Sequence, residues 1–366
     1  MKKEIKKERM ISQDIAKGLA ILLVTLVHSV KVNNIVGSAI AVLFGYIMPF
    51  FMFMSGYNYN DRDQSIKANL KRRVLKLLIP FFITTTIIFV LMGTYFYFVE
   101  DYSILEIAKS YLGFLVSKWG MNLIGLEWNQ VLFQRVLGPC WFIQFLIIAD
   151  LIFIPVHHYT KNDNKKLFVS ITALSLISVL LIRLGISLPW GIQNSFALAG
   201  LFLIANYIKR NDLLFKTKSK KYTIINCIIC VITIAVIQLL DNGAGYLGAG
   251  ELGSVLGGME VYILYLIAVI GSYLIINICK LIEKNKHLTK IFTNLGQNTF
   301  LILMIHMSIV HIVKHLFKLP QWNAADGLFG TFYYKELLVY PLILILVMIT
   351  VYLYKKLLGK LLKNTF

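Results

Sequence analysis

The chain has 366 residues, of which 58% are hydrophobic and 15% charged, with a mean hydropathy of +0.71 and a formal net charge of +19. In a typical soluble domain about 25% of the residues are charged, and one soluble core cannot bury this much apolar surface. The composition therefore excludes an ordinary soluble domain and predicts an all-α, polytopic membrane protein. The basic residues cluster between apolar runs, which is typical of membrane topology and not of a nucleic-acid-binding surface.

Ten apolar runs follow one another along the chain, and each approaches the roughly 17–25 residues that a membrane-spanning helix needs. We expect one integral membrane domain over 1–366, with no appended soluble domain. The run at 192–208 is short and contains Asn194. The expected spans are 11–32, 36–57, 77–99, 139–156, 167–184, 192–208, 222–240, 259–279, 295–313 and 337–358.

The distribution of positive charge predicts the orientation of these spans. If they alternate, 28 of the 37 Lys and Arg residues fall on the side that holds both termini. Cytoplasmic loops carry such an excess, so both termini are expected in the cytoplasm. No small-residue cleavage site follows the first apolar run, so the basic N-terminus and this run are interpreted as a retained anchor and not as a signal peptide.

Three segments between the spans have a character of their own. Residues 62–76 carry six Lys or Arg and apolar residues at helical spacing, which predicts a basic amphipathic helix on the inner leaflet. Residues 104–116 are expected to form an interfacial helix. The Gly-rich stretch 241–258 lacks Lys and Arg, so it is interpreted as an outer spacer and not as a phosphate-binding loop.

Lys17 and His28 lie in the first span, 11 positions and therefore about 16 Å apart along a helix. An ionisable side chain at membrane depth is a functional-site hypothesis by default. Lys17 forms an i, i+3 pair with Asp14. It is either an ordinary snorkelling lysine or a contact for an anionic cytosolic ligand.

His28 and His306 lie at matched depths in two spans that run in the same direction, so they could face one cavity. An imidazole can take a proton from a hydroxyl and return it near neutral pH. The alternative is that each histidine only hydrogen-bonds a neighbouring helix. That packing interpretation is preferred for His311 and His315, which lie nearer the outer surface.

The basic segment 62–76 has two interpretations. It can contact anionic lipid headgroups or a phosphorylated cytosolic cofactor. Cys227 and Cys230 lie in an apolar run with no second pair, so they and the other cysteines are expected to be buried hydrophobes, and no metal is expected. Other polar residues at or near membrane depth are Gln144, Asp150 and Glu260, and Glu127 lies in an outer segment.

Five short motifs, in this order along the chain, resemble the acyltransferase-three family of bacterial membrane O-acyltransferases. The nearest branch is the fucose-acetylase-like group, which commonly has Lys where other members have Arg. Lys17 and Lys76 are such positions. The motifs are Lys17 with His28; Phe50-Phe51 with Ser55-Gly56; Arg72-Arg73 with Lys76 before Pro80; Gly138-Pro139 with Trp141-Phe142; and Asn294 with Gly296, followed by His306.

The resemblance implies transfer of an acyl group, usually acetyl, from cytosolic acetyl-CoA to a hydroxyl of an extracytoplasmic saccharide. It implies His28 as the catalytic residue, in a cavity shared with His306. Expected partners are a surface polysaccharide or its lipid-linked precursor and membrane lipids, without nucleic acid. The expected donor-binding residues are Lys17, Ser55, Arg72, Arg73 and Lys76, and the expected acceptor-binding residues are Glu127, Trp141 and Glu260.

Two other functions fit a bundle of about ten helices. A transporter or flippase for a glycan or lipid-linked sugar is one, although the sequence shows no repeated halves. The membrane module of a fused amino-acid racemase is the other, although no racemase domain is present in the sequence.

Overall fold

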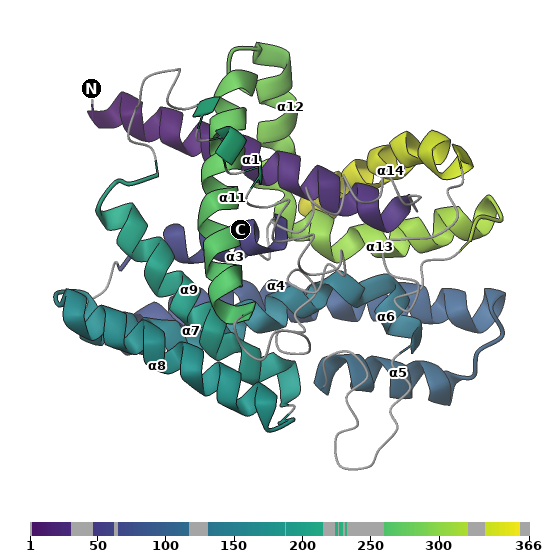
Figure 1. Cartoon of the computed structure of the whole chain (residues 1–366). Helices are drawn as coiled ribbons and strands as arrows, with labels where there is room; N and C mark the ends of the chain where they lie inside the picture. The colour runs from purple at the N-terminus through teal and green to yellow at the C-terminus, as the bar shows by residue number, and fades with distance from the viewer. Residues whose placement is uncertain are drawn as a thin grey trace.

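In the computed structural model of the chain, all regular secondary structure within the described residues is helical (Figure 1). These residues are 2–30, 47–61, 65–116, 131–186, 188–214, 260–320 and 334–358, with short pieces at 224–225, 227–229 and 231–232. The helices are α1 (Lys2–Ser29), α3 (Ile47–Tyr57), α4 (Ile66–Val99), α5 (Ile104–Val116), α6 (Val131–Leu137), the 3-10 turn η1 (Gly138–Cys140), α7 (Trp141–Thr160), α8 (Asn164–Arg183), the 3-10 turn η2 (Pro189–Gly191), α9 (Ile192–Arg210), α11 (Glu260–Ile282), α12 (Lys286–Gln297), α13 (Thr299–Leu316) and α14 (Tyr334–Leu358).

Eight helices within the described part are long and apolar enough to cross a membrane. They correspond to eight of the ten expected spans, so an all-α, multi-pass membrane protein is confirmed. Of the expected span 36–57, only the 11-residue apolar helix α3 is described. Most of the expected span 222–240 and the Gly-rich stretch 241–258 lie outside the described residues. The orientation of the termini stays a prediction.

The basic segment 62–76 is helical over its described part, as expected, but it is not a helix separate from the span 77–99. Its described part belongs to α4, a continuous helix of 34 residues that runs through Pro80. Ser65 caps the start of α4, accepting a hydrogen bond from the backbone N–H of Ala68 at 3.5 Å. At 1.5 Å per residue the helix is about 51 Å long. The apolar part of a bilayer is roughly 30 Å thick, so its basic first turns can extend beyond it.

Helix α12 lies mostly between the expected spans 259–279 and 295–313, where the sequence predicted no helix. The Asn285 side chain begins it by accepting hydrogen bonds from the backbone N–H groups of His287 and Leu288, at 3.0 and 3.2 Å. Such a cap satisfies two of the unpaired N–H groups at a helix start. The expected helix over 104–116 is present as α5.

The helices pack in two groups that share one continuous apolar core. In one group α9 packs against α7, α8 and α3. In the other, α1 lies across α12 and also contacts α13, α11 and α14 (Figure 1). Helix α3 joins the groups, because it packs on both α9 and α11. Gly56 makes the α3–α9 approach possible, since a Cβ there would collide with the backbone of Phe202.

Candidate functional site

The side chains of His28 and His306 meet between α1 and α13. Their ring centroids are 5.4 Å apart and the ring planes are inclined at 46°. His28 lies in the last turn of α1 and His306 near the middle of α13. The predicted juxtaposition of the two histidines is therefore present, although α1 ends at Ser29, earlier than the expected span 11–32.

The ring of His306 is held in one orientation by its own helix. Its Nδ1 lies 2.9 Å from the carbonyl oxygen of Ile302 and 3.0 Å from that of Leu303. Because carbonyl oxygens only accept, Nδ1 carries the proton and donates, and in the neutral ring Nε2 keeps its lone pair. This Nε2 is buried and has no hydrogen-bond partner among the described residues. A buried acceptor left without a partner is costly, which favours a role in holding a ligand proton.

Contacts on both sides fix the helices that carry the pair. On α1, Thr25 lies one turn before His28 and shares a 3.0 Å hydrogen bond with the hydroxyl of Tyr340 in α14. On α13, the hydroxyl of Ser308 donates to the carbonyl oxygen of Val136 at 3.2 Å. Sequence reasoning did not identify Thr25, Tyr340 or Ser308, because a hydroxyl in an apolar run gives no distinguishing pattern.

A second cluster forms where α3 ends beside α4 and α7. Arg73 Nε donates to Asp150 Oδ2 at 2.8 Å, and Arg73 Nη2 donates to the carbonyl oxygen and Oγ of Ser55 at 2.9 and 2.8 Å. The Asp150 side chain is completely buried. The guanidinium also lies over the ring of Tyr59, 5.6 Å from its centroid. The structure thus brings together the predicted residues Ser55 and Arg73, and adds Asp150 as the buried counter-ion.

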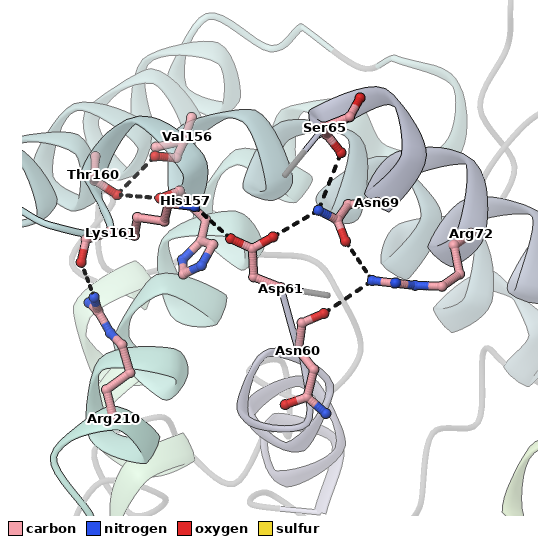
Figure 2. Close-up of polar contacts among 10 residues, drawn as sticks. All are labelled: Asn60, Asp61, Ser65, Asn69, Arg72, Val156, His157, Thr160, Lys161 and Arg210. Carbon is pink, nitrogen blue, oxygen red and sulfur yellow. Dashed lines mark hydrogen bonds and ion pairs between the residues drawn. The ribbon is translucent and has the colours of Figure 1, made fainter. Parts of the chain in front are cut away.

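Arg72 belongs to a polar network at the same end of the bundle (Figure 2). Its Nη2 donates to Asn69 Oδ1 at 2.5 Å and to the carbonyl oxygen of Asn60 at 3.1 Å. Asn69 Nδ2 donates to Asp61 Oδ1 at 2.8 Å, and Lys161 binds Asp61 Oδ2 at 2.9 Å. As Figure 2 shows, Asp61 links the start of α4 to the end of α7. Of the residues in this network, only Arg72 was predicted to be a site residue.

The electrostatics of the segment after α3 follow from these contacts. Partial burial favours the neutral form of Asp61, but the hydrogen bond and charge of Lys161 outweigh it, and the pKa of Asp61 is lowered. Burial, together with the Asp61 charge, raises the pKa of Tyr59 to about 12. Asp61 is therefore an anion and Tyr59 a neutral phenol at physiological pH.

The other predicted residues lie apart from these two centres. Lys17 forms the expected ion pair with Asp14, at 2.6 Å. Lys76 is exposed, and neither lysine is bonded to Ser55 or Arg73 within the described part of the chain. Trp141 is buried at the start of α7 with its ring edge-on to Phe145, 5.1 Å between centroids. Glu127 lies outside the described residues, as does the side chain of Glu260.

A further ionic group surrounds the end of α13. His311 Nε2 lies 2.6 Å from Glu100 Oε1, and Arg135 approaches the same carboxylate at 3.9 Å. Lys314 and Glu336 form a 2.7 Å ion pair with both side chains almost fully buried. These contacts join α13 to α4 and α14, which agrees with the packing interpretation of His311.

The acyltransferase domain family matches residues 11–356, almost the whole chain. The chain belongs to this family. No curated protein and no solved structure matches it. Membership implies acyltransferase activity, and the eight apolar helices make the protein a multi-pass membrane acyltransferase. The resemblance inferred from the five motifs is thus confirmed for the family, while the fucose-acetylase-like branch stays a prediction.

Proposed function

We propose that this acyltransferase moves an acetyl group from cytosolic acetyl-CoA to a hydroxyl of a cell-surface saccharide or its lipid-linked precursor, in the bacterial cytoplasmic membrane. The pairing of His28 with His306 supports this proposal most directly. Two imidazoles whose ring centroids are 5.4 Å apart, on helices held by buried hydrogen bonds, offer proton-transfer groups deep in the bundle. Acyl transfer to a hydroxyl needs such a group.

The proposed reaction is a direct transfer. A ring nitrogen of His28 takes the proton of the acceptor hydroxyl while its oxygen attacks the thioester carbonyl. The new C–O ester bond forms, the C–S bond breaks, and the imidazolium returns the proton to the departing thiolate, giving free CoA. Nε2 of His306 can accept a hydrogen bond from the acceptor or from His28, and so orient the attacking group.

The donor is proposed to enter at the end of the bundle where Arg73 and Ser55 lie. A guanidinium has five N–H donors. Asp150 and Ser55 engage three of those of Arg73, and the two on Nη1 have no acceptor among the described residues. These two remain available for a donor oxygen, while Arg72, Lys17 and Lys76 add positive charge to the face predicted to be cytoplasmic.

The acceptor is proposed to approach from the opposite face. Glu127 and Glu260 would bind saccharide hydroxyls, and Trp141 would offer its ring to the apolar face of a sugar. These three roles rest on residue chemistry and on expected position, and each can be tested by the acceptor KM of an alanine variant.

The test uses the purified chain in liposomes, with acetyl-labelled CoA on one side and a cell-envelope saccharide fraction on the other. We expect label to appear on the saccharide as an alkali-labile ester, with one CoA thiol released for each ester formed. Release of CoA without labelled saccharide would contradict the proposed acceptor class. Saccharide movement without any CoA release would contradict the enzyme assignment and favour a flippase.

A further inference from the structure

An open cavity of about 450 Å³ lies along one face of α12, beside Ile11 of α1 and the end of α11. Ligand pockets in proteins commonly have volumes of about 300–1,000 Å³. The residues that matter here are Lys286, Thr289, Lys290, Thr293 and Glu283. No residue that lines the cavity belongs to the two clusters described above, and of these lining residues the motifs include Asn294.

Two exposed lysines line this cavity at the start of α12. Lys286 and Lys290 are four positions apart, so they are neighbours on one helix face, where like charges repel. Both lie in or near the first turn of α12, and a helix N-terminus disfavours cations and favours anions. Neither lysine forms an ion pair within the described residues, and the nearby Glu283 accepts a hydrogen bond from Ser12. A bound anion would reduce the repulsion between the two lysines and would also interact favourably with the helix N-terminus.

Thr293 supplies an independent observation. It lies one turn beyond Lys290 and lines the same cavity, and its Oγ1 is buried without a hydrogen-bond partner among the described residues. A buried hydroxyl that forms no hydrogen bond is costly, so the site is incomplete as a packed core. By contrast, the guanidinium groups of Arg72 and Arg73 already donate to several protein acceptors.

The cavity is connected to the helix that carries His28. Gln297, at its far end, donates to Asp14 Oδ2 at 3.3 Å, and Asp14 pairs with Lys17. Ile11 of α1 lines the cavity, 17 positions before His28, which corresponds to about 26 Å along the helix. A donor that spans this distance must carry its acyl group on a long arm, as acyl-CoA does and acetyl phosphate does not.

We propose that the α12 cavity binds the phosphate groups at the nucleotide end of the acyl donor, with Lys286 and Lys290 contacting phosphate oxygens and Thr293 donating a hydrogen bond. This inference rests on the proposed function and gives the donor a second cationic subsite, separate from Arg73. The acyl end of the donor then extends along α1 toward His28.

The experiment measures binding of CoA and of pantetheine, which lacks every phosphate, to the full chain in phosphatidylcholine nanodiscs. The Lys286→Gln/Lys290→Gln variant should weaken CoA binding about tenfold or more and leave pantetheine binding unchanged. The matched control is Lys284→Gln, which removes an exposed lysine outside the cavity and should change neither affinity. An unchanged CoA affinity in the double variant would overturn the proposal.

A second variant separates ligand binding from folding. Thr293→Val replaces the hydroxyl by a methyl group of similar size, so the melting temperature should not fall, because a costly buried polar group is removed. CoA affinity should still fall several-fold. A lower melting temperature with unchanged CoA affinity would make Thr293 a structural residue and contradict its assigned contact.

A third arm uses nanodiscs that contain phosphatidylglycerol. Retention of this anionic lipid that depends on both lysines, with CoA affinity independent of them, would assign the cavity to a lipid headgroup and overturn the donor assignment. If the wild type transfers acetyl groups and every variant binds CoA as tightly as the wild type, only this subsite is wrong. If the wild type binds no CoA, the proposed function is wrong as well.

Discussion

Gly296 of α12 lies directly against the backbone carbonyl oxygen of Asp14 in α1, so that a Cβ at position 296 would overlap that oxygen. Gly18 of α1 lies in the same way against the carbonyl of Phe292. Small residues at such crossings let helix backbones approach closely in a membrane. The two glycines therefore set the position of α1, the helix that carries His28.

Replacing Gly296 by alanine should force α1 and α12 apart. Overpacking of this kind typically costs about 1–3 kcal/mol, so we expect a lower melting temperature together with a large loss of acyl transfer. Gly138→Ala is the matched control, because a Cβ there meets no atom within 4 Å. A Gly296→Ala variant with wild-type stability and activity would show that the close crossing does not matter.

The fold could be predicted where a long run of apolar residues was enough to form a membrane-spanning helix. Eight of the expected spans appear as long helices, because a run of apolar residues has few other stable arrangements in a bilayer. The continuity of α4 could not be predicted, because the change from basic to apolar composition after Lys76 looks like a boundary, whereas the helix runs through it and through Pro80. The helix α12 was missed because its residues are mixed in polarity and its start depends on the Asn285 cap.

The Arg73–Asp150 ion pair should be necessary as a pair. Asp150→Ala leaves the Arg73 charge without its counter-ion, and breaking a buried pair costs about 3–5 kcal/mol, so the melting temperature should fall strongly. The double variant Arg73→Met/Asp150→Leu should recover most of that stability by apolar packing. It should nevertheless bind CoA about tenfold more weakly, because the donor loses the Nη1 contacts. Recovery of both stability and CoA affinity would make Arg73 purely structural.

The Asp61–Lys161 ion pair should make the melting temperature of the protein depend on pH in the acid range. The pKa of Asp61 is lowered in the folded chain from 3.8, so its contribution is present above that value and is lost as the pH falls through the lower folded value. The effect is small because both side chains of this ion pair are partly exposed to solvent. Lys161→Gln should reduce the fall in melting temperature between pH 5 and pH 2. Lys166→Gln, which removes an exposed partner of Asp163 at 4.0 Å, serves as the control, and equal acid profiles for both variants would contradict this assignment.

The candidate site could be predicted only in part from the sequence. His28, His306, Ser55 and Arg73 could be found because each is a chemically distinctive residue in an apolar or motif-like context. Asp150 was noticed as a buried acid, but its partner lies 77 positions away and only packing brings the two together. The network around Asp61 depends on turns between helices, where sequence carries little information about contacts.

The predicted topology can be tested on a chain whose four native cysteines are replaced. Single cysteines at Asn364 and Gly245 should react with a membrane-impermeant maleimide from opposite sides of the membrane, because the positive-inside rule places the C-terminus in the cytoplasm and the Gly-rich stretch outside. Reaction of both from the same side would contradict the ten-span arrangement.

The histidine pair gives the prediction that bears most directly on mechanism. A positioned general base contributes about 10²–10⁴-fold to a rate, so His28→Ala should reduce acetyl transfer by about that factor while CoA binding is retained. His306→Ala should lose less, since its Nδ1 is committed to Ile302 and Leu303 and only Nε2 can act on a neighbour. If the two act as a unit, the double variant should be no slower than His28→Ala alone. His287→Ala, at an exposed histidine, should keep full activity. Near-normal transfer by His28→Ala would make His28 a packing residue, and His306 would then be the base to test, followed by Glu260.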